Sequence, residues 1–300
     1  MVFDVIMPTY DNLEELKACL AGFGAQSFKD FRLCVCVDGS RDGTLEYLRN
    51  THCSFPMDVL HHPRFQHIGR NATRNLALPL LKAEYVLLFD SDAKPVPELL
   101  AKHLEVLSGK NVISSGILYY SNTDQNPWAW YLSTRTRYHS PQGSLLPYSH
   151  FASGNVAFKA KYFIELGGQD AAMRNYGGGD IEFGIRLWDR YHLPIVNNAH
   201  ACGYSTMNKK LDFALSQLYE FGKYNLPYIH GKHPGHRHIY NLYLMAGKGL
   251  LPFMYRMVMR PRIQRFFIKK AGALPLIMRK WAIHYSAAVS ICEGFKNRIA

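Results

Sequence analysis

The chain has 300 residues, enough for one large domain or one domain with an appendage. Its net charge of +12 is unevenly spread, since residues 206–300 hold 16 Lys and Arg against three acids and the first 205 residues sum to −1. A near-neutral first two-thirds excludes a protein that wraps nucleic acid along its whole length, because such binding needs many phosphate contacts.

The six cysteines predict reduced, unpaired thiols. None of them makes a C-x-x-C pair, and Cys34 and Cys36 alternate with valines as strand residues do. The first residues lack the basic start and apolar run of a signal peptide, and no stretch approaches the roughly 18 apolar residues of a membrane span. We therefore expect the chain to fold in a reducing cytoplasm.

Apolar runs alternate with helical patterns along the first third of the chain. Strands are predicted over residues 2–7, 31–37, 57–60 and 85–89. Helices are predicted after the first two runs, near 71–80 and from residue 96. In the first helix Asp11 can act as the cap, and Leu13, Leu16 and Leu20 make one apolar stripe. This alternation is typical of the α/β class, with a mostly parallel sheet covered by helices on both faces.

The second half is less regular. After a run at 111–117, the aromatic, proline-bearing stretch 126–131 is predicted to be a functional loop. A helix over 159–166 is stopped by Gly167-Gly168, and another over 181–190 follows three glycines. Beyond Thr206 the sequence predicts basic helices. We therefore divide the chain into a first domain, 1–205, and a helical extension, 206–300.

Polar residues follow three of the predicted strands. In open parallel sheets the ligand lies beyond the carboxyl ends of the strands, so 8–10, 38–40 and 90–92 are candidates for a site. Asp90 and Asp92 directly follow the run 85–89, and paired carboxylates suit Mg²⁺ or Mn²⁺. An acidic pair of this kind can equally cap the next helix, and spacing alone leaves both interpretations open.

Two further sets of residues could contact a nucleotide. Asp38 could accept an N–H from a base, or it could only form a turn with Asp42. Arg70 and Arg74 lie four residues apart at the start of a predicted helix and could reach a diphosphate. The alternative for the arginines is a solvated helix face.

Taken in order, these segments resemble glycosyltransferase family 2, which has the GT-A fold. The segments that carry the resemblance are 5–10, 37–44, 69–75, 89–92, 153–158, 167–168 and 177–183. The later segments are similar to the galactosyltransferase and chondroitin-synthase-like branch. The resemblance covers roughly residues 2–205, and the basic tail lies outside it.

The resemblance implies a donor site and a metal site, with Tyr10 against the base, Asp38 on its edge and Arg74 facing the diphosphate. The residues implied to bind the donor are Pro8, Thr9, Tyr10, Asp38, Arg70, Arg74, Asp90, Ser91, Gly154 and Asn155. Mn²⁺ or Mg²⁺ would be held by Asp90 and Asp92. His200 stands where related enzymes place a third metal ligand, although a lone histidine is more often structural.

Asp180 matches the second acid of the family's Gly-Gly-Glu-Asp segment, which implies that it is the general base of an inverting displacement. Such a reaction passes through an oxocarbenium-like state and needs a base opposite the leaving group. The alternative is a plain helix N-cap. This chain departs from the family pattern, with Gly179 where Glu is usual and Tyr176 where Trp is common.

Acceptor contacts are expected from the aromatic stretch and from the segment around Asp180. The residues are Trp128, Trp130, Tyr131, Gly178, Gly179 and Glu182. The aromatic rings could stack on sugar or lipid, or they could fill the open end of the sheet. In the tail, 256–270 and 274–291 mix basic and apolar residues, which is typical of segments that lie on anionic membrane surfaces. The alternative is a helical cap with a solvated basic face.

The sequence therefore predicts a metal-dependent inverting glycosyltransferase, cytoplasmic and peripheral at the inner face of the membrane. Its donor would be a nucleotide diphosphate sugar, UDP by resemblance, and its acceptor a glycan or lipid-linked glycan. One alternative is a nucleotidyltransferase acting on sugar phosphates, but residues 8–11 are not the glycine-rich, basic phosphate loop that it needs. The other is a non-catalytic basic protein that binds membrane or nucleic acid. We expect no nucleic-acid partner.

Overall fold

The computed structural model describes residues 1–270 and 274–298, and the chain forms two compact units. The first unit consists of Met1–Ser121, Thr136–Arg174 and Gly179–Thr206. The second consists of Asn122–Arg135, Asn175–Gly178 and Met207–Ala300. The second unit thus contains two short segments besides the extension predicted from residue 206.

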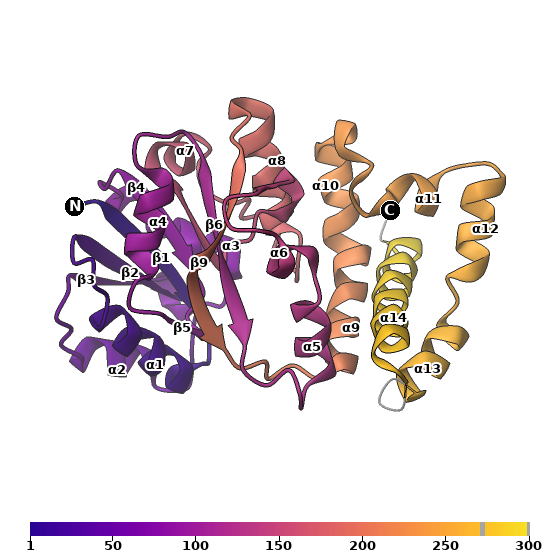
Figure 1. Cartoon of the computed structure of the whole chain (residues 1–300), viewed down its shortest axis with the longest axis horizontal. Helices are drawn as coiled ribbons and strands as arrows, with labels where there is room; N and C mark the ends of the chain where they lie inside the picture. Colours follow the sequence, from indigo (N-terminus) through magenta and orange to yellow (C-terminus); the bar gives the residue numbers. More distant parts are fainter. Residues whose placement is uncertain (271–273, 299–300) are drawn as a thin grey trace. The chain divides into compact units, whose positions relative to one another are not determined.

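Within the described residues, the first unit holds one nine-stranded sheet (Figure 1). The strands are β1 Phe3–Thr9, β2 Phe31–Val37, β3 Met57–His61, β4 Tyr85–Phe89, β5 Ala93–Pro95, β6 Ile113–Tyr120, β7 Leu145–Leu146, β8 Asn155–Lys159 and β9 Ile195–Ser205. Their order is β3-β2-β1-β4-β8-β6-β9-β5, with β7 also paired to β9. Strands β1 to β4 pair in parallel, whereas β8 runs antiparallel between β4 and β6.

Helices cover both faces of this sheet. They are α1 Leu13–Gly24, α2 Thr44–Asn50, α3 Arg70–Asn75, α4 Leu99–Leu107, α6 Thr136–His139, α7 Ala160–Glu165 and α8 Gly179–Tyr191, with short turns η1 Pro63–Phe65, η2 Leu78–Leu80 and η3 Tyr148–His150. Buried side chains of α1, α2 and α4 pack on one face, and those of α7 and α8 pack on the other. Along β1, Val5 and Met7 enter the first core and Ile6 the second. This is the alternation that a strand buried on both faces requires.

The second unit is helical, as predicted for the tail. Its elements are α5 Pro127–Ser133, α9 Leu211–Glu220, η4 Phe221–Asn225, α10 Leu226–Lys232, η5 Pro234–His236, η6 Ile239–Asn241, α11 Leu242–Ala246, α12 Leu250–Val258, α13 Pro261–Lys270 and α14 Leu276–Lys296. A Cβ on Gly222 would lie 2.1 Å from the carbonyl oxygen of Ile291, so η4 and α14 cross with their backbones almost touching. Among the described residues, we find no helix with the length and apolar character needed to span a bilayer.

Two local predictions are wrong. The backbone amide of Leu13, at the start of α1, donates to the carboxylate of Asp42 at 2.8 Å, so Asp42 rather than Asp11 caps this helix. Asp11 is in the left-handed region (φ 45°) and accepts from the amide of Arg41 instead. The expected loop at 126–131 is mostly helix α5. Its start is stabilised by the Asn126 side chain, which accepts from the amide of Trp128 at 2.9 Å.

The six cysteines are free, and four of them are buried, which confirms the prediction of unpaired thiols. Burial raises the pKa of the Cys36 thiol and that of the Cys34 thiol, the latter to about 12. These side chains therefore act as small apolar core residues.

Candidate active site

The polar residues that follow the strands meet at one edge of the sheet. In the parallel register of β1 and β2, Thr9 lies beside Val37, so Asp38 directly follows this pair. Strand β4 runs parallel on the other side of β1 and ends one residue before Asp90. The sequence prediction of a shared polar edge at the strand ends agrees with this topology.

Asp90 is held by two arginines of α3. The Arg74 guanidinium donates to Oδ1 of Asp90 at 2.7 Å, and Nη1 of Arg70 lies 3.8 Å from Oδ2. Arg74 is 0% exposed, and its burial lowers the pKa of its guanidinium against the attraction of Asp90. Arg74 is therefore buried against Asp90, whereas Arg70, on the same helix, is exposed.

Asp180 belongs to the same group of side chains. Gln169 accepts from Nη1 of Arg74 at 3.1 Å, and its own amide donates to Oδ1 of Asp180 at 3.4 Å. The Ser153 hydroxyl also donates to Oδ1 of Asp180, and the Ser153 carbonyl oxygen accepts from Arg74. We refer to Asp90, Arg74, Gln169, Ser153 and Asp180 as the Arg74 cluster. It connects the end of β4 to the first turn of α8.

Gln169 is the member of this cluster that the sequence did not predict, and it is held from two sides. The Asn75 side chain accepts from the backbone amide of Gln169 at 2.9 Å and donates to its carbonyl at 2.7 Å. Arg186 of α8 donates to the preceding carbonyl, that of Gly168, at 2.8 Å. The one sequence signal for Gln169 is its place directly after the two-glycine turn. Helices α3 and α8 thus set its position.

The predicted nucleoside end is built around Asp38. Its buried carboxylate accepts from the backbone amides of Ile68 at 2.8 Å and Gly69 at 3.1 Å, and Nδ1 of His67 lies 3.1 Å from Oδ2. The His67 ring faces the ring of Tyr10, with centroids 4.2 Å apart. Asp38 thus anchors the loop that precedes α3. Tyr10 and His67, which are both exposed, form an aromatic pair beside it. His67 was not predicted.

Thr9, Asn12 and Ser91 tie the ends of β1 and β4 together. The Thr9 hydroxyl donates to Oδ1 of Asn12 at 2.6 Å, and Nδ2 of Asn12 donates to the Ser91 hydroxyl at 2.8 Å. Pro8, Thr9 and Ser91 are buried. These three predicted donor residues are therefore buried at the carboxyl ends of β1 and β4, and Asn12, which was not predicted, links Thr9 to Ser91.

The predicted metal ligands do not form a set of three. In residues 1–270 and 274–298, no three His, Cys, Asp or Glu side chains are grouped so that they could hold a metal ion. His200 is exposed on β9, and its backbone amide donates to Gln142 at 3.4 Å. Its role as a ligand stays a prediction. Asp90 and Asp92 still suit Mg²⁺ or Mn²⁺, because one or two carboxylates, together with substrate phosphates and water, commonly hold such ions.

Glycines leave room at two points of the site. A Cβ on Gly154 would lie 3.0 Å from Oδ2 of Asp90, so this glycine makes space for the carboxylate. A Cβ on Gly179 would lie 2.5 Å from Oδ1 of Asn71, whose side chain donates to the carbonyl of Asp170 at 3.0 Å. A larger residue at position 179, where Glu was expected, would therefore require the Asn71 side chain to move. The neighbouring Gly178 adopts φ 85°, a conformation that favours glycine.

Two residues predicted to touch ligands are buried in structural contacts. Asn155 donates to the carbonyl of Ala201 at 2.9 Å, and its Oδ1 meets Nε2 of His103 at 2.9 Å. Burial lowers the pKa of His103 to about 4, so this ring is neutral. Glu182 is fully buried and accepts from Arg186 at 2.9 Å. Neither Asn155 nor Glu182 has a side chain exposed to a donor or acceptor, so both predicted contacts are corrected to supporting roles.

The three aromatic residues of α5 belong to the second unit. The rings of Trp128 and Tyr131 stack with centroids 5.3 Å apart, and both side chains are 6% exposed against α9 and α14. They form a core there rather than a stacking surface or a plug of the sheet. Trp130 is partly exposed beneath the Arg279 guanidinium, 5.6 Å from its ring centroid. An acceptor contact by Trp130 stays a prediction.

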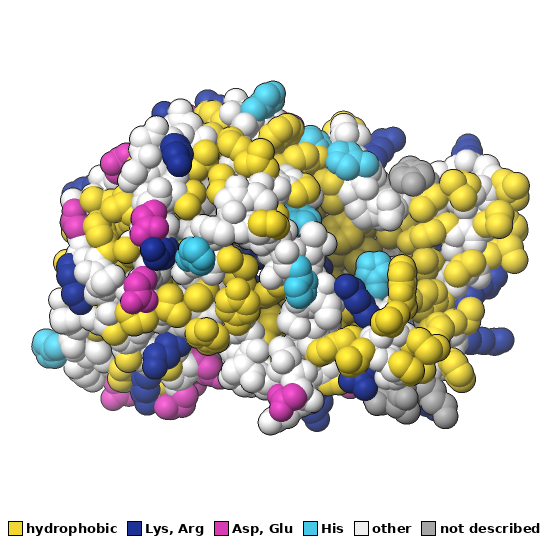
Figure 2. Space-filling view, viewed as in Figure 1, with side chains coloured by type: hydrophobic (Ala, Val, Ile, Leu, Met, Phe, Trp, Pro, Cys, Tyr) yellow, Lys and Arg dark blue, Asp and Glu magenta, His cyan; other side chains and the backbone are white. Residues whose placement is uncertain are grey.

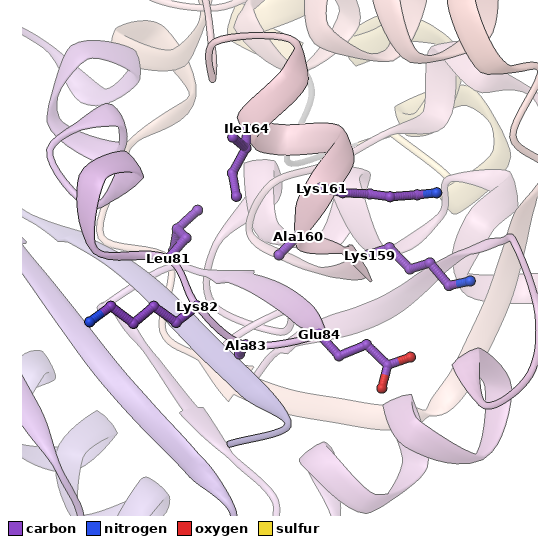
Figure 3. Close-up of a pocket in the computed structure, with 8 residues that line it drawn as sticks. All are labelled: Leu81, Lys82, Ala83, Glu84, Lys159, Ala160, Lys161 and Ile164. Carbon is purple, nitrogen blue, oxygen red and sulfur yellow. The ribbon is translucent and has the colours of Figure 1, made fainter.

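A hollow of about 410 Å³ lies at the opposite end of β4, lined by residues 81–84, 159–161 and Ile164 (Figure 3). Of its three lysines, Lys82 points away from Lys159 and Lys161 in Figure 3. It lies at the amino end of β4, whereas ligands of such sheets bind beyond the carboxyl ends. We therefore assign the candidate active site to the edge that carries the Arg74 cluster.

Two family models match the chain. The model "Glycosyl transferase family 2" matches residues 4–167, and the model "N-terminal domain of galactosyltransferase" matches residues 136–210. Chondroitin synthase of Escherichia coli is 25% identical over 218 residues, covering 61% of this chain and 32% of that protein. The uncharacterized glycosyltransferase YfnE of Bacillus subtilis is 23% identical over 243 residues, covering 62% of this chain and 60% of that protein. The match thus spans less than two-thirds of either relative.

Two solved structures share the fold. The mannosyltransferase PcManGT from Pyrobaculum calidifontis, in complex with GDP-Man and Mn²⁺, has a TM-score of 0.64 at 17% identity, covering 99% of this chain and 88% of that one. TarS 1–349 of S. aureus, in complex with UDP, has a TM-score of 0.53 at 16% identity, covering 99% and 89%. These likenesses confirm the predicted GT-A fold.

Proposed function

The chain belongs to glycosyl transferase family 2, and we propose that it moves a sugar from a nucleotide diphosphate sugar to a hydroxyl of a glycan or lipid-linked glycan. UDP is the proposed carrier. The observation that carries the proposal is the Arg74 cluster, because it brings Asp180 into one hydrogen-bonded group with Asp90 at the end of β4. An in-line displacement requires a base on one face of the sugar and charge neutralisation at the leaving group on the other, and this cluster holds the proposed base and a proposed cation-binding carboxylate on one rigid support.

In the proposed reaction Asp180 is the general base. It takes the proton of the acceptor hydroxyl while that oxygen bonds to the anomeric carbon from one face of the sugar. The bond from the anomeric carbon to the diphosphate breaks on the other face, and its electron pair stays on the phosphate oxygen. The product has inverted configuration. Within the described residues, the Ser153 hydroxyl and the Gln169 side-chain amide both donate to Oδ1 of Asp180. The proposed acceptor of the proton is therefore Oδ2.

The departing diphosphate needs positive charge near it. Arg70 is exposed and reaches Asp90, so it is the proposed side chain for the diphosphate, and Arg74 fixes Asp90. Asp90 and Asp92 would hold Mn²⁺ or Mg²⁺, which supplies charge neutralisation for the leaving group when bound. Metal use and nucleotide donors have precedents among proteins of this fold, since PcManGT was solved with GDP-Man and Mn²⁺ and TarS with UDP.

The function is tested with a panel of UDP and GDP sugars. We expect release of the nucleoside diphosphate from a UDP sugar only with Mn²⁺ or Mg²⁺, slowly to water and faster with a sugar acceptor. NMR of the product should show the anomeric configuration opposite to that of the donor. Pyrophosphate release from a nucleoside triphosphate and a sugar 1-phosphate, assayed in parallel, would identify a nucleotidyltransferase instead, and no turnover of any donor in the panel would contradict the proposal.

Gln169 is proposed as a positioning residue for Asp180. Gln169→Leu is expected to lower kcat by about tenfold to a hundredfold with little change in donor KM, because Asp180 loses one of the donors that orient it. Gln169→Glu would place a carboxylate beside Asp180 and favour its protonated form. The acidic limb of the pH–rate profile should therefore move to higher pH.

The control for both variants is Gln125→Leu, at an exposed glutamine outside the Arg74 cluster. Melting temperatures of all three proteins establish that they are folded. An unshifted pH–rate profile for the Glu variant, together with normal kcat for the Leu variant, would remove Gln169 from this role.

A further inference from the structure

Helix α12 presents its apolar side to solvent. Six large apolar side chains on it are each 49–74% exposed: Leu250, Leu251, Phe253, Met254, Met257 and Val258. At about 100° per residue they occupy one stripe roughly 160° wide. On the opposite side Arg256 is half-buried and donates to the carbonyl of Gly247 at 2.9 Å. This orientation reverses that of an ordinary surface helix, which buries its apolar stripe.

Helix α13 and the first turns of α14 extend this surface. Their exposed apolar side chains, 41–77% accessible, are Ile263, Phe266, Leu276, Ile277, Met278 and Trp281. Gln264 of α13 donates to the carbonyl of Ser286 at 2.9 Å, and the Tyr285 hydroxyl donates to the carbonyl of Val258 at 2.7 Å. Helix α14 thus joins α12 and α13. We call these twelve side chains the apolar helix surface, and Figure 2 shows hydrophobic side chains gathered over these helices.

The charge around the apolar helix surface indicates which kind of partner would bind there. Residues 221–292 contain 12 Lys and Arg and no Asp or Glu. On α13 the exposed Arg262, Arg265 and Lys269 lie within about 60° of one another around the helix axis. A second copy of the chain would bring like charges together, which disfavours a dimer through this surface. An anionic lipid surface complements both the basic charge and the exposed apolar side chains.

We propose that α12, α13 and the start of α14 dock on the surface of an anionic bilayer. The apolar helix surface enters the boundary between head groups and acyl chains, and Arg262, Arg265 and Lys269 contact the head groups. This inference goes beyond the proposed transfer reaction and does not depend on it. It agrees with a lipid-linked acceptor, which such docking would bring to the enzyme.

The test is co-sedimentation of the full chain with vesicles of phosphatidylcholine alone or mixed with phosphatidylglycerol. The wild type is expected to bind the mixed vesicles more tightly. Leu251→Gln/Met254→Gln should weaken that binding by at least about tenfold through lost apolar burial. Arg262→Gln/Arg265→Gln/Lys269→Gln should weaken it by on the order of a hundredfold and remove the preference for anionic lipid.

The matched control is Leu145→Gln/Ile164→Gln, which replaces exposed apolar residues of the first unit and should bind like the wild type. Equal binding by the Leu251/Met254 variant, or equal affinity for the two vesicle types, would overturn the proposal. So would a dimer that this same variant dissociates. Hydrolysis of UDP sugars is measured in parallel. Its absence with intact vesicle binding would contradict the proposed function and leave the docking inference standing.

Discussion

Replacing Asp180 with Asn is expected to lower kcat by about 10²–10⁴ while donor KM stays nearly constant, because an amide cannot take the acceptor's proton. The Ser153 and Gln169 donors both address Oδ1 of Asp180, and the amide oxygen of Asn can accept both hydrogen bonds. The variant should therefore fold normally and keep the rest of the Arg74 cluster. Initial rates with a UDP sugar and an acceptor measure the loss, and calorimetry with UDP checks donor binding.

Asp189→Asn provides the matched control, since Asp189 is an exposed acid on the same helix, α8. It should keep wild-type kcat. If the Asp180 variant also turned over at a near-normal rate, the base would have to be another residue. If it lost UDP binding as well as turnover, Asp180 would be part of the donor site and not the group that accepts the proton.

Asp92→Asn is expected to reduce metal-dependent turnover by about 10²–10⁴, because neutralising a leaving phosphate contributes several kcal/mol to the transition state. Asp92 is exposed just beyond β4, and the melting temperatures of the variant and the wild type check that the substituted protein is folded. A second expected result is independent of turnover: Mn²⁺ should no longer strengthen UDP binding, as measured by calorimetry with and without the ion.

Glu98→Gln serves as the control for this variant, because Glu98 is an exposed acid a few residues further along the chain. In the Glu98 variant, Mn²⁺ should strengthen UDP binding as much as it does in the wild type. Mn²⁺-dependent UDP binding of normal strength in the Asp92 variant would exclude Asp92 as a ligand. The candidates for a metal site would then have to be sought away from the end of β4.

The edge of the sheet could be predicted because it depends on local patterns. The buried runs that end directly before Asp38 and Asp90 are recognised as strands by their length and apolar residues. In an open parallel sheet the carboxyl ends of the strands lie at the same end of the sheet, so the two aspartates can be placed near one another without knowing how the side chains pack. The helical tail is predictable for the same reason. In both cases the signal lies within a few neighbouring residues.

Contacts between distant residues could not be predicted. Gln169 matters because Arg74, 95 positions earlier, donates to it, and nothing in the local sequence marks that contact. Asn155 and Glu182 were expected at the ligand because they lie in segments that match the family pattern. Whether such a side chain faces a ligand or a buried partner depends on tertiary packing. The same limit applies to Trp128 and its place in the core of the second unit.

The contact between Gly179 and Asn71 restricts how this protein can diverge from its relatives. A Cβ at position 179 would lie 2.5 Å from Oδ1 of Asn71, so a side chain there fits only if the Asn71 amide moves and its hydrogen bond to the carbonyl of Asp170 is lost or remade. The family's glutamate should therefore be tolerated better at 179 when residue 71 is smaller. Substitutions at the two positions should be coupled in their effects on stability.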